Sequence, residues 1–216
     1  MRLLLDQCEG RAPLSPFGDM KLPCAGRDLM DGALGALDIS NGDDTETCMR
    51  WLRNPAAGSP QSFGGQPWPA IWYTYGHRFN ATDKAWLFEQ MNKTAGATVT
   101  NLTNSSSRAA AGNPGTDVSY NNMYYMNMVN VALLGEIVGN KDAADMGYRL
   151  IDDWLQYDQT ADLHEFTSPT YYWVQINSLY MGYLYTRRPG AKEVFKAILD
   201  HSERTQATRC CVYEDP

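Results

Sequence analysis

A chain of 216 residues is long enough for one domain with a substantial core, and its 44% hydrophobic and 20% charged residues exclude a disordered or fibrous protein. Its 18 Lys and Arg against 25 Asp and Glu give a net charge of -7, which argues against a surface that binds nucleic-acid phosphates. No stretch approaches the roughly 18 apolar residues of a membrane span. With 13 Tyr and 6 Trp the chain is rich in residues that face sugars and also fill cores.

The N-terminus places three consecutive leucines ahead of Asp6, fewer than the apolar run of about 7–15 residues in a signal peptide, so no signal peptide is visible. Four N-glycosylation patterns nevertheless begin at Asn80, Asn92, Asn101 and Asn104. Such patterns are used in surface loops of secreted proteins, and polar loops also generate them by chance. The localisation is therefore left open, with an extracellular or secretory glycoprotein as the hypothesis that the clustered patterns suggest.

The five cysteines lack the spacing of a metal site. None forms a C-x-x-C pair, and they lie away from the three histidines, so no metal site is expected. Their odd number argues against a closed disulfide framework. Phosphate-binding loops, dinucleotide fingerprints, serine-hydrolase elbows and H-E-x-x-H motifs are absent from the sequence, and we expect no cofactor.

The first third of the chain predicts irregular structure broken by short helices. Proline and glycine interrupt residues 1–26, which we expect to be irregular. Apolar spacing then predicts short helices over 27–37 and 45–53, followed by a Gly-, Pro- and Ser-rich loop over 54–69. An aromatic segment occupies 70–79.

Thr82 is a favourable N-cap, because its hydroxyl accepts an amide hydrogen bond from a first helical turn, and it predicts a helix to about residue 94. Residues 95–118 consist mainly of Ala, Gly, Thr, Asn and Ser. We expect a long polar surface loop there, since such a stretch buries too little apolar area to order itself. This loop is interpreted either as a wall of a substrate channel or as a glycosylated loop without a further role.

From residue 120 onward, apolar residues repeat at helical spacing. They predict four helices, with a non-helical segment before the third, over 123–138, 143–157, 173–186 and 192–201. We therefore predict an all-α fold, with one domain of helical hairpins over residues 27–205 and a tail over 206–216.

Four segments carry the most specific pattern in the chain. They are S-Y-N-N-M-Y at 119–124, L-G-E at 134–136, D-D-W-L at 152–155 and H-E-F-T-S-P-T-Y-Y at 164–172. In this order they resemble the helical hairpins of (α/α)-toroid carbohydrate-active proteins, which include polysaccharide lyases and glycoside hydrolases. The resemblance implies consecutive hairpins that form a partial (α/α)-toroid, because a closed ring has more hairpins than this chain, and a sugar cleft at one rim.

In toroid lyases an Asn or Gln neutralises the carboxylate of a uronic acid, a His removes the proton at C5 or assists, and a Tyr protonates the leaving oxygen. The resemblance carries these catalytic roles to Asn122 (or Asn121), His164 and Tyr172 (or Tyr171). A tyrosine with a pKa near 10 is a good acid at neutral pH and becomes a base only where a nearby cation or donor lowers that pKa.

An arginine commonly completes such lyase sites, and Arg78, Arg149 and Arg187 are equal candidates for it. A hydrolase needs two carboxylates, about 5–5.5 Å apart for retention or about 6.5–9.5 Å for inversion. Glu165 and Asp117 are the carboxylates we assign to that alternative.

Further residues are expected to bind substrate. Tyr120, Asn121 and Tyr171 accompany the rim, and Trp72 and His77 belong to the aromatic segment that could stack on sugar rings. Each assignment has a structural alternative: the histidines as hydrogen-bonding groups, the asparagines as helix caps and the aromatic residues as core.

The sequence thus predicts a carbohydrate-active enzyme, with a lyase cleaving a uronic-acid-containing glycan by β-elimination placed ahead of a glycoside hydrolase. A non-catalytic helical fragment that binds glycan or protein is the third hypothesis. The expected partner is a polysaccharide or oligosaccharide, with neither nucleic acid nor membrane. A second copy or a completing partner chain is also expected, because an open arc of hairpins exposes apolar faces.

Overall fold

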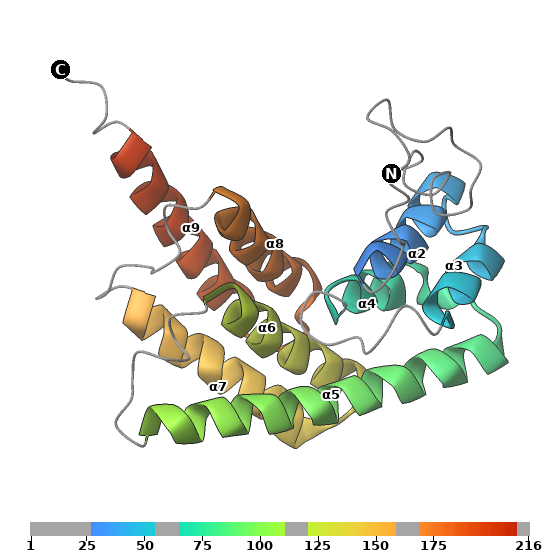
Figure 1. Ribbon diagram of the computed structural model, residues 1–216, viewed down its shortest axis with the longest axis horizontal. Helices are drawn as coiled ribbons and strands as arrows, with labels where there is room; N and C mark the ends of the chain where they lie inside the picture. The colour runs from blue at the N-terminus through green and yellow to red at the C-terminus, as the bar shows by residue number, and fades with distance from the viewer. Residues whose placement is uncertain (1–26, 55–64, 111–120, 159–168, 211–216) are drawn as a thin grey trace, which may run out of the picture. The chain divides into compact units, whose positions relative to one another are not determined.

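The computed structural model describes residues 27–54, 65–110, 121–158 and 169–210, and within these ranges the chain contains helices and no strand. This confirms the all-α prediction. The chain divides into two compact units, residues 1–91 and 92–216, and the long helix α5 (Ala81–Ala110) contributes to both (Figure 1). None of the helices in the described ranges has the length and apolarity to cross a membrane.

The first unit is built on a pair of packed helices, α2 (Arg27–Ser40) and α3 (Thr45–Leu52), close to where the sequence predicts them. The indole of Trp51 lies directly on Gly32, where an added Cβ atom would come within 1.9 Å of the ring. Cys48 on the same helix as Trp51 is buried and free. Burial, together with the charges of nearby carboxylates, raises the pKa of the Cys48 thiol well above its ordinary value.

Three short helical segments follow, namely α4 (Pro67–Ala70), the π-helix η3 (Ile71–Tyr75) and the 3-10 helix η4 (Gly76–Arg78). The loop expected up to residue 69 is therefore wrong in its last residues. Pro67 occupies the first helical position, where its missing N–H costs no hydrogen bond. Burial of Trp68 then holds this turn in the core.

The long helix α5 corrects two sequence predictions. Asn80, rather than Thr82, precedes the helix and accepts a hydrogen bond from the backbone N–H of Asp83 at 2.9 Å. The helix continues to Ala110, so the loop expected over 95–118 is wrong for residues 95–110. Its remaining part, 111–118, lies outside the described residues.

Small polar residues form a helix here because their polar groups are satisfied and one face is buried. Thr98, Thr100 and Thr103 donate their hydroxyls to backbone carbonyls four residues earlier, at 2.8, 3.1 and 2.8 Å. Ala95, Thr98 and Leu102 are buried and share one helical face. The glycosylation patterns at Asn92, Asn101 and Asn104 consequently lie in a helix, and not in the loops where such patterns are used.

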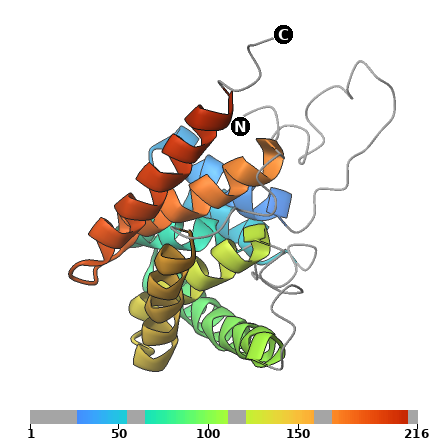
Figure 2. The same ribbon diagram turned by 90° about the vertical axis from the view of Figure 1, so that its left-hand side faces the viewer.

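The second unit contains two consecutive helical hairpins. Helix α6 (Asn121–Val138) packs against α7 (Lys141–Asp158), and α8 (Pro169–Tyr185) packs against α9 (Ala191–Cys210). Figures 1 and 2 show α8 and α9 side by side, and α6 also packs against α8. The four helices confirm the predicted order of hairpins. They begin or end up to several residues beyond the predicted bounds.

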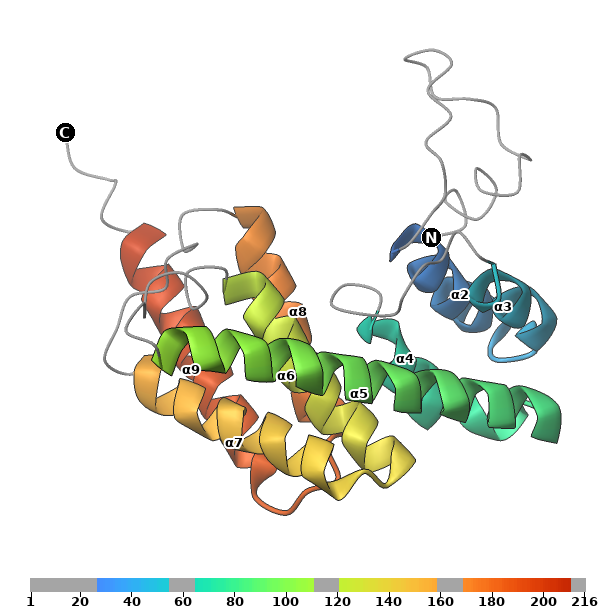
Figure 3. The same cartoon turned by 60° about the horizontal axis from the view of Figure 1, so that its bottom comes forward.

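Glycine and alanine bring the backbones of α6 and α7 into direct contact. Figure 3 shows α6 leading into α7 as a hairpin. A Cβ atom added to Gly135 would lie 2.4 Å from the backbone nitrogen of Ala144, and one added to Gly147 would lie 2.5 Å from that of Ala132. Ala132 lies three residues before Gly135 on α6, and Gly147 lies three residues after Ala144 on α7, so the two helices pair in an antiparallel register. The same antiparallel register brings Tyr125 to Trp154 seven residues further along.

Tyr125 and Trp154 form the buried contact at that position. Their rings meet edge to face, with centroids 4.7 Å apart, and the indole N–H of Trp154 donates a hydrogen bond to the hydroxyl of Tyr125. Both side chains are at least 96% buried. The contact satisfies the polar atoms of two large rings inside the core.

Tight turns close the two hairpins at one end of the unit. Gly139 adopts φ 71°, and the N–H of Asn140 reaches back to the carbonyl of Gly135 at 2.9 Å, the pattern of a Schellman cap. The side chain of Asn140 then accepts a hydrogen bond from the N–H of Ala143 and begins α7.

The second turn, between α8 and α9, is tied to the first hairpin. The hydroxyl of Thr186 bonds that of Tyr148 at 2.6 Å. The guanidinium of Arg188 lies 4.6 Å from the centre of the Tyr148 ring and pairs with Asp145 at 2.7 Å. Together with a hydrogen bond from Lys141, Arg188 holds the pKa of the Asp145 carboxyl below its usual range.

We expect Gly147→Ala to lower the free energy of unfolding by about 1–3 kcal/mol, because the new methyl group must push two backbones apart. The measurement is urea denaturation of the full chain. Gly96→Ala is the matched control, since that exposed helical glycine has open space around it and alanine there should stabilise by about 0.5–1 kcal/mol. Equal effects at both positions would contradict close contact between α6 and α7.

We expect the stability difference between the wild type and Asp145→Asn to depend on pH. The folded pKa of Asp145 is lower than its unfolded pKa, so its contribution is complete above the unfolded value near 3.9 and disappears as the pH falls through the folded value. Thermal unfolding of both proteins from pH 7 to pH 3 measures this. A difference that grows toward low pH would contradict the ion pairs.

Candidate functional site

The first helices of the two hairpins run in the same direction. Glu136, near the end of α6, accepts a hydrogen bond at 3.0 Å from the backbone N–H of Arg187, which follows the end of α8. Because their last turns meet there, α6 and α8 begin together at the opposite end of the unit. We call that opposite end the open end.

The open end is where the sequence places most of its catalytic candidates. Asn121 and Asn122 begin α6, and Tyr171 and Tyr172 lie in the first turn of α8. The side chains of Asn121, Asn122 and Tyr171 lie outside the described part of the chain. Their positions in the backbone nevertheless bring the two pairs to the same end of two packed helices.

The remaining candidates fall on segments that the structure does not describe. His164 and Glu165 belong to the stretch that connects the end of α7 to the start of α8. Tyr120 and Asp117 precede α6 and also lie outside the described residues. Their catalytic and substrate-binding roles stay predictions.

Tyr172 differs from its expected setting. The sequence places it in a non-helical segment, but α8 begins at Pro169, a residue favoured at the first helical position. Tyr172 is half-buried, and its ring meets that of Trp173 edge to face with centroids 6.3 Å apart. A helix therefore carries this tyrosine, and fixes its backbone more firmly than a loop would.

The position of Arg187 removes it as the missing lyase arginine. It follows the end of α8 at Tyr185, which is about 20 Å along the helix from Tyr172 at about 1.5 Å per residue. Arg78 lies in the first unit and pairs with Asp43 at 3.4 Å. Arg149 is exposed on α7, in the middle of the hairpin.

Sequence reasoning missed an arginine that the fold carries to the open end. Helices α8 and α9 are antiparallel, and Gly182 packs against the ring of Phe195. Continuing that register brings Arg204 level with Trp173, in the second turn of α8. Arg204 is exposed, and its Nε donates to the carbonyl of Asp200 at 3.0 Å. The register between α8 and α9 indicates the position of Arg204, which the sequence pattern alone does not.

The aromatic segment of the first unit separates into a buried and an accessible part. Trp68 is 2% exposed and packs against Trp86, with ring centroids 6.3 Å apart. Trp72 is half-buried and lies 6.4 Å from Phe88, which is exposed. His77 is exposed on η4. Trp72 lies on a π-helix, and its sugar-binding role stays a prediction.

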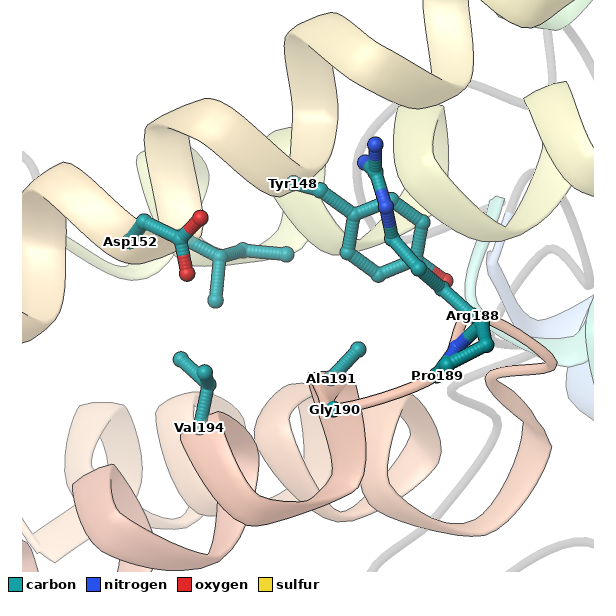
Figure 4. Close-up of a pocket in the computed structure, with 8 residues that line it drawn as sticks. Tyr148, Asp152, Arg188, Pro189, Gly190, Ala191 and Val194 are labelled. Carbon is teal, nitrogen blue, oxygen red and sulfur yellow. The ribbon is translucent and has the colours of Figure 1, made fainter.

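A pocket of about 240 Å³ lies elsewhere, between α7 and the start of α9 (Figure 4). Tyr148, Asp152, Arg188 and Val194 are among the residues that line it. It lies beside the closed turns, away from the open end. The guanidinium of Arg188, the cation that lines it, stacks on Tyr148 and pairs with Asp145. The pocket therefore contains none of the predicted catalytic residues.

Gln175 is an unexplained polar group near the open end. It is 2% exposed on the side of α8 that faces the core, one turn after Tyr171, and its amide nitrogen has no hydrogen-bond partner in the part of the chain that the structure describes. Sequence reasoning missed this residue because it lies among aromatic and aliphatic neighbours. Within the described ranges, no three His, Cys, Asp or Glu side chains come together in a group that could hold a metal ion.

Comparison of this chain with protein-family models, with curated protein sequences and with solved structures finds no match in any of the three.

We expect Gln175→Met to raise the free energy of unfolding by about 1 kcal/mol, because it replaces a buried amide, whose N–H groups have no acceptor among the described residues, by an apolar side chain of similar size. Urea denaturation of the full chain measures the change. A loss of stability would mean that the amide is hydrogen-bonded in solution.

Proposed function

We propose that this chain is a carbohydrate-active domain of partial (α/α)-toroid type that cleaves a uronic-acid-containing glycan by β-elimination. The observation that carries the proposal is the shared direction of α6 and α8, which brings Asn121 and Asn122 to the same end of the unit as Tyr171 and Tyr172. The segment with His164 joins α8 at that end.

The alternation of helix character supports a toroid-like arrangement. Helix α6 is buried on nearly all sides from Tyr125 to Gly135, with Asn127 as the half-buried exception, and α8 has no charged residue. Helices α7 and α9 carry charged residues on exposed faces. Apolar first helices with amphipathic second helices are what successive hairpins need when the first helices form an inner layer.

The proposed reaction has three requirements that these residue types meet. An Asn amide donates hydrogen bonds to the uronate carboxylate and so stabilises the charge that develops when the proton at C5 leaves. The electron pair forms a C4–C5 double bond while the bond from C4 to the leaving oxygen breaks. His164 takes the proton or assists, and Tyr172 protonates the leaving oxygen.

Arg204 is the cation that we assign to this site, a position that the sequence left open among Arg78, Arg149 and Arg187. Its register position brings it level with Trp173, the residue that follows Tyr172 on α8. A guanidinium there would bind a sugar carboxylate and would favour an ionised tyrosine.

The test is a panel of uronic-acid and neutral polysaccharides incubated with the full chain. Absorbance of the unsaturated product and the formation of reducing ends are followed together. For a lyase we expect absorbance that falls by at least about 100-fold in His164→Ala and in Tyr172→Phe, since general acid and base groups contribute about that much. Tyr183→Phe, near the far end of α8, is the matched control and should retain activity.

Two results would overturn elimination. Reducing ends without absorbance, lost in Glu165→Gln, would assign hydrolysis by the carboxylate pair of Glu165 and Asp117. If no substrate gives absorbance or reducing ends, and the protein has a helical circular dichroism spectrum, the hypothesis of a non-catalytic fragment would be favoured.

A further inference from the structure

One face of α8 exposes large apolar side chains in a row. Trp173 is 68% exposed, Tyr180 51% and Leu184 44%, and Asn177 is exposed between them. At 100° per residue these four positions fall within about 60° of each other on the helix, so they form one stripe. We call Trp173, Asn177, Tyr180 and Leu184 the α8 stripe.

The opposite face of α8 accounts for the packing of the helix. Gln175, Ser178, Leu179 and Gly182 are buried there, and α8 packs against both α6 and α9. The stripe is therefore not needed to hold the helix in the unit. Large aromatic rings left in solvent cost free energy, which makes such a stripe a marker for a bound partner.

We propose that the α8 stripe binds uncharged sugar residues of a glycan, with pyranose rings stacked on Trp173 and Tyr180. Seven residues of helix separate the two rings by about 10 Å, the length of about two sugar units. Asn177 lies between them and offers an amide donor and an acceptor for sugar hydroxyls. The stripe begins beside Tyr172, so it continues from the open end along the helix.

The chemistry of the stripe favours a sugar over a protein partner. A stable protein interface uses about 20–30 residues on each side and surrounds its apolar centre with a polar rim. The stripe has four residues, on a helix of 17 residues without a single charge. Aromatic faces with one amide between them match the apolar faces and hydroxyl edges of a sugar chain.

The absence of charge on α8 also limits which sugars can bind. A chain made only of uronic acids would bring a carboxylate with every ring. Helix α8 offers no cation to compensate for the lost hydration of these carboxylates, and Arg204 of α9 is level only with Trp173, at one end of the stripe. Lys192 of α9 lies 5.8 Å from the ring centre of Tyr183, toward the far end of α8. The inference rests on the proposed function and narrows it to a glycan in which neutral sugars accompany the uronic acid.

Affinity electrophoresis of the full chain tests this inference without any turnover. The gels contain xylan, glucomannan, mixed-linkage glucan, a glucuronic-acid-substituted xylan, polygalacturonate or alginate. We expect retardation by at least one of the first four, a Kd at least about 10-fold higher in Trp173→Ala and in Tyr180→Ala, and weaker retardation by the two polyuronates. Ile39→Ala removes an apolar side chain of the first unit that is about as exposed as Tyr180, and this variant should bind like the wild type.

Three results would overturn the inference. They are no retardation by any glycan that contains neutral sugars, stronger retardation by polyuronate that is unchanged in Trp173→Ala, and self-association in light scattering that Trp173→Ala abolishes. Circular dichroism and thermal unfolding establish that the variants are folded, as the exposure of both rings leads us to expect.

The two proposals fail separately. Retardation that depends on Trp173, without cleavage of any polysaccharide, supports the stripe and overturns the elimination reaction. Cleavage with wild-type rates in both Trp173→Ala and Tyr180→Ala, with unchanged retardation, supports the reaction and overturns the stripe.

Discussion

The direct backbone contact between α6 and α7 is the constraint on which the second unit depends. It requires Gly135 and Gly147 to lack side chains, and it fixes the register that joins Tyr125 to Trp154. With that hairpin fixed, the hydrogen bond from Arg187 to Glu136 sets the direction of α8. The placement of the candidate residues at one end follows from a contact between small residues in the middle of the hairpin.

The sequence predicts the four hairpin helices of the second unit well, because the helical spacing of apolar residues and the glycines at the turns indicate the same boundaries. It fails over 95–110, where average polarity suggests a loop while Ala95, Thr98 and Leu102 form a narrow buried face. It also fails at Tyr172, because Pro169 begins the helix that the pattern starts later. In both places local composition does not predict the helix, because helix formation depends on which side chains are buried and on which residue begins the helix.

The candidate site is predictable to a lesser degree than the fold. Residue types in a familiar order indicate Asn122, His164 and Tyr172, and only the topology brings two of the three segments together. Arg204, Gln175 and the α8 stripe have no signal in the sequence, since an exposed Trp173 and a buried Trp68 look alike until their neighbours are known. Pairing between helices supplies that information.

The burial of Cys48 changes how many cysteines of this chain are available for pairing. A thiol reacts through its thiolate, and the raised pKa of Cys48 keeps it protonated as well as covered. It is thereby withdrawn from disulfide exchange. Of five cysteines this leaves an even set of four, Cys8, Cys24, Cys210 and Cys211, so the odd total no longer argues against complete pairing in an oxidising compartment.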